Sequence, residues 1–167
     1  MSMEHVSVAE RLAFGRVVSQ DREPLPILHL MPRPGTALVG RLLLASIFLV
    51  SGIAKVTDSS GTIAHMTQAG IPAAEVLVWF AAFAELAGAV SLITGFLTRL
   101  GAIALMVFLV AATLLFHDFW NYSGAERLPQ MVNFLKNVGL GGGLALVVAY
   151  GPGRYSLDHK LRWPIQA

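Results

Sequence analysis

Cysteine is absent from this 167-residue sequence. Its absence excludes disulfides, thiolate metal sites and dithiol redox pairs, so any electron chemistry would need a bound cofactor or a partner protein. Charged residues are scarce as well, at 13% of the chain, against about a quarter of an average soluble domain. With 55% apolar residues and a mean hydropathy of +0.65, the composition indicates a membrane protein.

Signatures for nucleotide, flavin or haem binding are also missing. The glycines within 139–143 lie inside an apolar run and do not follow a predicted strand, as a dinucleotide-binding loop would. His65 and His117 lack the spacing of paired haem ligands, and His65, in a polar loop, is expected to be solvated. We therefore expect no covalently bound cofactor, and no nucleic-acid partner for a chain whose net charge is only +2.

Four long apolar segments are present, and they cover residues 37–56, 76–97, 100–116 and 132–150. About 20 apolar residues at ~1.5 Å per residue span the ~30 Å hydrocarbon core of a bilayer. The sequence therefore predicts an all-α membrane protein with one four-helix bundle over residues 37–150. Between the first two spans we expect a short surface helix over 62–69 that ends at Gly70.

Polar tails flank the predicted bundle. Residues 1–36 lack the apolar run of a secretory signal, so we expect no cleaved leader. Apolar residues from Val8 to Val18 recur at helical spacing, which favours an amphipathic helix at the membrane surface, with an unstructured tail as the alternative. Four prolines follow and predict an extended linker. Basic residues gather in both tails and in the 98–99 turn, so both termini, including the tail of residues 151–167, are predicted to be cytoplasmic.

Glu85 is the single carboxylate inside the 76–97 segment. An ionised carboxylate at that depth costs about 2.5–3.5 kcal/mol on insertion scales, so it should face the bundle interior and have a partner. By their depth along the bilayer normal, Lys136 and Arg41 are the two cations considered as partners. We favour Lys136, because it lies on the side where the other titratable groups gather.

The polar residues of the spans support two interpretations. In the first, Glu85 and a cation form a buried ion pair that fixes helix register. In the second, the polar side chains line a pocket that opens outward and suits a quinone or another flat, carbonyl-bearing lipid, because lysine and histidine can donate to carbonyl groups and Glu85 with His117 can relay protons. The polar residues of this pocket would be Glu85, Lys55, His117 and Lys136, and its apolar walls Trp79, Phe83, Phe116 and Trp120.

Two further patterns bear on helix packing. Arg41, Gly52 and Lys55 share one face of the first span. Gly139 and Gly143 form a small-xxx-small pair in the fourth span, which allows a neighbouring backbone to approach closely.

A set of short motifs resembles the DoxX family of four-helix membrane proteins. These motifs extend in order over residues 38–158 and are FLVSGIAK (48–55) after Arg41, GIP (70–72), ELAG (85–88), GFLTR (95–99), AT (112–113), FHDFW (116–120), NFLKN (133–137) and SLD (156–158). The resemblance implies a protein of the bacterial cytoplasmic membrane. It also implies a link to quinone oxidoreduction, since the family takes its name from a membrane subunit associated with thiosulfate and quinone.

These observations lead to three functional hypotheses. The first is a quinone-linked membrane oxidoreductase component, with Glu85 and His117 as catalytic proton groups and a redox partner for the electrons. Its substrate-binding residues would be Lys55, Lys136, Asn137, Arg41 and Trp120, the polar positions of the resemblance together with one aromatic wall. The second is a non-enzymatic scaffold that docks another membrane protein, or a second copy, through its glycine face. The third is a carrier for a small anion or a lipid.

Overall fold

A computed structural model describes residues 33–161 of the chain. The amphipathic helix predicted around Val8 to Val18 lies outside the described residues. The boundaries predicted for the two polar tails stay a prediction.

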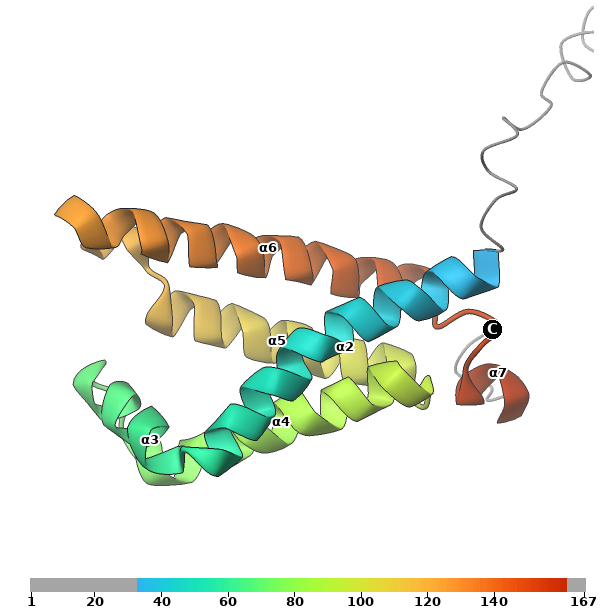
Figure 1. The fold of residues 1–167 in the computed structure, drawn as a ribbon, viewed down its shortest axis with the longest axis horizontal. Helices are drawn as coiled ribbons and strands as arrows, with labels where there is room; N and C mark the ends of the chain where they lie inside the picture. The colour runs from blue at the N-terminus through green and yellow to red at the C-terminus, as the bar shows by residue number, and fades with distance from the viewer. Residues whose placement is uncertain (1–32, 162–167) are drawn as a thin grey trace, which may run out of the picture. The chain divides into compact units, whose positions relative to one another are not determined.

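Four long helices form the body of the fold (Figure 1). They are α2 (Arg33–Thr57), α4 (Ala74–Thr94), α5 (Thr98–Phe116) and α6 (Arg127–Tyr150). Shorter elements connect or follow them: α3 (Ser59–Gln68), the 3-10 turns η2 (Phe119–Asn121) and η3 (Gly124–Glu126), and α7 (Leu157–Leu161). Residues 33–161 contain no strand, and all four long helices are long and apolar enough to cross a membrane. The predicted all-α, four-span architecture is confirmed, and the orientation of the termini stays a prediction.

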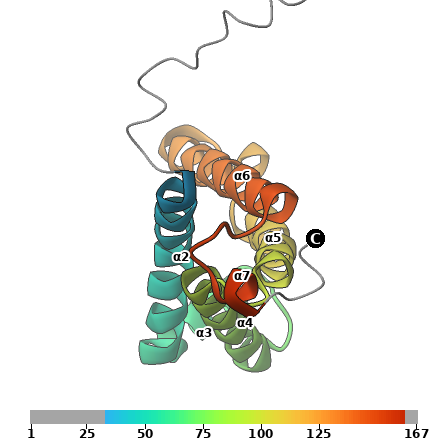
Figure 2. The same cartoon turned by 90° about the vertical axis from the view of Figure 1, so that its right-hand side faces the viewer.

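The long helices pack in the order α2, α4, α5, α6 around the bundle (Figure 2). Glycines permit close approaches: a Cβ atom at Gly52 of α2 would lie 2.8 Å from Cγ of Leu86 on α4. Gly88 of α4 likewise leaves room for the side chain of Leu105 on α5. The main apolar core lies at these contacts and includes Ala45, Phe48, Ala89, Leu92, Ala102, Leu105 and Leu144. Shape complementarity between small and large residues therefore sets the distance between the helices. This is expected in a membrane, because lipid tails are as apolar as the side chains and close packing must hold the helices together.

The glycine pair of α6 packs at only one of its two positions. A Cβ atom at Gly143 would lie 2.9 Å from Cδ2 of Leu44 on α2, whereas one at Gly139 would meet nothing within 4 Å. Gly143 thus serves the contact between α2 and α6 inside the chain.

Helix boundaries differ from the predicted ones where caps override the apolar pattern. The second span was predicted to end at residue 97, but α4 ends at Thr94 because Gly95 adopts a left-handed conformation, with φ of 69°. Asp58 caps α3, accepting a hydrogen bond from the Gly61 amide at 3.0 Å, so this helix begins three residues before the predicted start at 62. Gly70, with φ of 72°, follows the end of α3 as predicted.

The residues after α6 fold back onto the turn between α4 and α5. The buried carboxylate of Asp158 in α7 accepts hydrogen bonds from the amides of Leu97 and Thr98 at 2.8 and 2.9 Å and from the Thr98 hydroxyl at 2.8 Å. These amides belong to the residue that precedes α5 and to its first residue, where they have no partner within the helix. Asp158 is therefore the N-terminal cap of a helix that begins 60 residues earlier.

Arg41 reinforces the same end of the bundle. Its side chain is 1% exposed and donates to the Leu92 carbonyl at 3.1 Å and to the Tyr155 carbonyl. Leu92 lies in the last turn of α4, where a cation is favoured by the helix dipole. Arg41 and Asp158 together join α2, α4 and α5 to the segment 155–158, and we call this group of contacts the α7 clasp.

We predict that Asp158→Ala destabilises the fold by about 2 kcal/mol, because it leaves the buried donors of Leu97 and Thr98 without an acceptor. Equilibrium unfolding in mixed micelles measures the change. His159→Ala is the matched control, because it removes an exposed neighbouring side chain. Equal stability of the two variants would show that the hydrogen bonds of Asp158 contribute nothing to stability.

Candidate functional site

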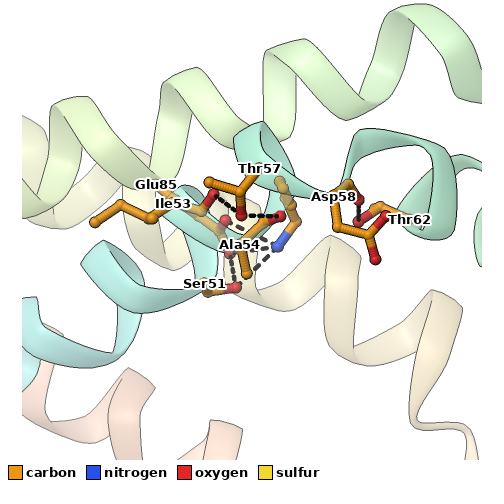
Figure 3. A network of polar contacts seen from close by, with 8 residues as sticks. Ser51, Ile53, Ala54, Thr57, Asp58, Thr62 and Glu85 are labelled. Carbon is orange, nitrogen blue, oxygen red and sulfur yellow. Dashed lines mark hydrogen bonds and ion pairs between the residues drawn. The ribbon is translucent and has the colours of Figure 1, made fainter.

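An ion pair between α2 and α4 neutralises the intramembrane carboxylate (Figure 3). Nζ of Lys55 lies 2.9 Å from Oε2 and 3.1 Å from Oε1 of Glu85. The Ser51 hydroxyl donates to Oε1 at 2.9 Å, and Nζ of Lys55 donates to Oγ of Ser51 at 2.8 Å. The side chain of Glu85 is 5% exposed and that of Lys55 is 20% exposed. Every pair within this triad is therefore in direct contact, and Lys55 keeps part of its surface accessible.

The spacing of residues along α2 allows the contacts among Ser51, Lys55 and Glu85. Ser51 and Lys55 lie four residues apart and share one face of the helix. Gly52 lies beside them, and a Cβ atom there would lie 3.3 Å from Cβ of Glu85. A larger residue at position 52 would push α2 and α4 apart at the level of the ion pair.

The preference for Lys136 as the partner of Glu85 is wrong, and so is the alternative of Arg41. Depth along the bilayer normal does not determine which helices are neighbours. Lys55 lies on α2, which packs against α4, whereas Lys136 lies on α6 and donates instead to Oδ1 of Asn133 at 3.1 Å. Arg41 belongs to the α7 clasp at the other end of α2.

The remaining polar residues come from α5 and α6. The buried amide of Asn137 donates to Oγ1 of Thr113 at 2.9 Å, and Thr113 in turn donates to the Leu109 carbonyl at 2.5 Å. Nδ1 of His117 lies 2.8 Å from Oε1 of Gln130. Because an amide oxygen only accepts, Nδ1 is the donor in this contact, and in the neutral form of the ring Nε2 is then an acceptor.

Most of the predicted site residues line a single cavity of about 860 Å³. Its polar lining includes Ser51, Lys55, Glu85, His117, Lys136 and Asn137, and the rest of its wall is largely apolar. Phe83 and Phe116 are part of that wall, as predicted. Arg41, Trp79 and Trp120 are not among its lining residues; Trp120 packs edge to face against Phe119 and Phe134 instead. A volume of this size falls within the ~300–1,000 Å³ typical of small-molecule sites.

Several residues of the site escaped the sequence reasoning. Ser51 is the main one, although its position one helical turn before Lys55 could have revealed it. His65 was expected to be solvated, and it is exposed, but its ring also stacks on Phe116 with centroids 5.4 Å apart and lines the cavity. Within residues 33–161, no group of three or more acidic or histidine side chains could hold a metal ion.

Comparisons with known proteins identify the family of this chain. The DoxX family model matches residues 36–118. The inner membrane protein YphA of Escherichia coli K12 is 30% identical over 128 residues, which cover 77% of this chain and 91% of YphA. The inner membrane protein YqjF of the same organism is 33% identical over 124 residues, 74% of this chain and 90% of YqjF. No solved structure matches. The chain thus belongs to the DoxX family and is a multi-pass protein of the bacterial inner membrane.

Proposed function

We propose that the cavity binds the headgroup of a lipid quinone and that the chain is a component of a quinone-linked membrane oxidoreductase. The observation that carries the proposal is the contact triad of Ser51, Lys55 and Glu85 in the wall of an otherwise largely apolar cavity within the membrane spans. A quinone headgroup is flat and apolar apart from its carbonyl oxygens, so it requires an apolar slot with a few well-placed hydrogen-bonding groups.

The polar groups of the cavity match both redox forms of such a headgroup. The ammonium group of Lys55 carries three donors and can turn one of them to a quinone carbonyl. A quinol presents hydroxyl donors instead, for which the Glu85 carboxylate and Nε2 of His117 are acceptors. The contact with Lys55 offsets the cost of a carboxylate at this depth, and the Glu85 oxygens remain acceptors at the cavity wall.

The redox step needs a second protein. Reduction of one quinone to quinol consumes two electrons and two protons, and oxidation of the quinol releases them. A chain without cysteine supplies no dithiol for those electrons, so they pass to or from a partner protein that carries a redox cofactor. Glu85 and His117 exchange the protons with the quinol hydroxyls.

Two other hypotheses receive less support from the geometry. The contact of Lys55 with Glu85 cancels one of the cations that would draw a small anion into the cavity. A scaffold role was predicted to involve the glycine face, yet Gly143 packs against Leu44 of the same chain. Gly143→Leu would therefore disturb folding as well as docking, so this variant does not distinguish a scaffold from a quinone-binding protein.

The first test is the lipid content of the purified protein. We expect about one quinone per chain after extraction from mild detergent, identified by mass spectrometry. Glu85→Gln and His117→Ala should each lose it, with binding of added decylubiquinone weakened about tenfold, which corresponds to ~1.4 kcal/mol. Glu75→Gln is the matched control, because it changes an exposed glutamate in the first turn of the same helix. Copurification of bulk phospholipid alone, with quinone affinity unchanged in all variants, would contradict the proposal.

A second test separates quinone binding from a purely structural role of the ion pair. Lys55→Met and Glu85→Leu should each destabilise the protein by about 3 kcal/mol, because each leaves an uncompensated charge inside the bundle. The double variant should recover most of that loss, with a coupling of about 1–3 kcal/mol in a double-mutant cycle of unfolding free energies. We expect the double variant to fold but not to bind decylubiquinone. Wild-type quinone binding by the folded double variant would assign the pair to structure alone.

A further inference from the structure

We propose that the ligand of this cavity is a long-tailed lipid whose tail leaves the cavity sideways, between α4 and α5, into the bilayer. The inference rests on the proposed function and specifies the class of ligand: a headgroup carried on an apolar chain, as opposed to a water-soluble compound. Three observations support it. They concern the exposed residues in the cavity wall, the small residues where α4 and α5 face each other, and the apolar cluster at the end of the cavity next to α3.

The cavity wall between α4 and α5 is also the outer surface of the bundle. Phe80 and Phe83 of α4 are 66% and 73% exposed, and Val107 and Leu115 of α5 are 68% and 54% exposed. All four line the cavity. Apolar side chains that line a cavity and are also largely exposed mark a place where it opens to an apolar surrounding. Since both helices are membrane spans, this opening faces hydrocarbon.

Small residues leave room for a chain at this opening. Ala81 and Ala84 of α4 and Ala111 and Ala112 of α5 line the cavity. The tight contact between the two helices lies nearer α7, where Gly88 meets Leu105 and Gly101 meets Ser91. Figure 1 shows α4 and α5 separating from there toward α3. The lining residues of α5, from 104 to 116, extend over about 18 Å of helix axis, more than half of the ~30 Å hydrocarbon core.

An apolar cluster closes part of the end of the cavity next to α3. Met66 of α3 is buried against Ala74 and Val78 of α4, and Phe116 of α5 packs against this cluster. The ring of His65 stacks on Phe116 at an interplanar angle of 19°. Helix α3 therefore bridges α4 and α5 at the loop end of the cavity and closes part of that end with an apolar cluster, while the exposed polar side chains of His65 and Lys136 line the remainder. A membrane lipid meets no such cluster at the opening between α4 and α5.

The test compares two probes on the full chain in lipid nanodiscs: decylubiquinone, and the same benzoquinone headgroup without a tail. Ala111→Trp fills the proposed path of the tail, and Ala87→Trp is the matched control, because Ala87 is exposed on α4 but does not line the cavity. We expect Ala111→Trp to raise the Kd of decylubiquinone about tenfold and to leave the Kd of the tail-less headgroup unchanged. Ala87→Trp should change neither Kd. Thermal unfolding of each variant verifies folding, and Ala111→Phe is the milder replacement if the tryptophan variant unfolds.

Each other outcome has a defined meaning. If Ala111→Trp leaves both Kd values unchanged, or raises both equally, the lateral path is overturned while the quinone site stands. A selective loss of decylubiquinone in Leu140→Trp, on the α6 side of the cavity, with none in Ala111→Trp, would also overturn it. If the wild-type chain binds neither probe, the proposed function itself fails.

Discussion

The pairing of Glu85 with Lys55 is the constraint on which the arrangement of the helices depends. A carboxylate in a hydrocarbon span cannot be solvated, so a cation must reach it from a neighbouring helix. Lys55 meets that requirement only where α2 and α4 lie close together, and Gly52 beside Leu86 permits that closeness. The need of Glu85 for a cation thus determines which helix packs against α4 and in which register, and it requires a small residue at position 52.

Helix α2 has a second cation on the same face, and it acts at the other end of the bundle. Arg41 and Lys55 are fourteen residues apart in the sequence, about 21 Å along the helix axis. Arg41 joins the last turn of α4 to the segment after α6, and Asp158 in that segment caps α5. This end of the bundle is held by buried hydrogen bonds. The cavity lies nearer α3, where the helices separate.

The sequence was sufficient for those features that depend on local pattern. Apolar runs of membrane-spanning length predicted the four helices, and the cost of a buried carboxylate identified Glu85. The partner of Glu85 could not be predicted, because depth is a property of one helix and contact is a property of two. Asp158 belongs to a motif of the sequence, but its capping role was missed for a similar reason: a side chain that caps a helix sixty residues earlier has no local signature. The width between α4 and α5 depends on which alanines face one another, and that also requires the packed structure.

The location of the triad is what favours a binding role over a structural one. A pair that only fixed register would be expected to lie sealed between helices, and apolar residues of similar volume could often replace it without loss of stability. Here the lysine remains 20% exposed, and all three residues of the triad line the cavity. The cost of placing these charges inside the membrane is offset by their mutual contacts, which leaves Lys55 as a donor and Glu85 as an acceptor at the cavity wall. A ligand that carries both oxygen functions and an apolar body fits both the polar wall and the apolar remainder.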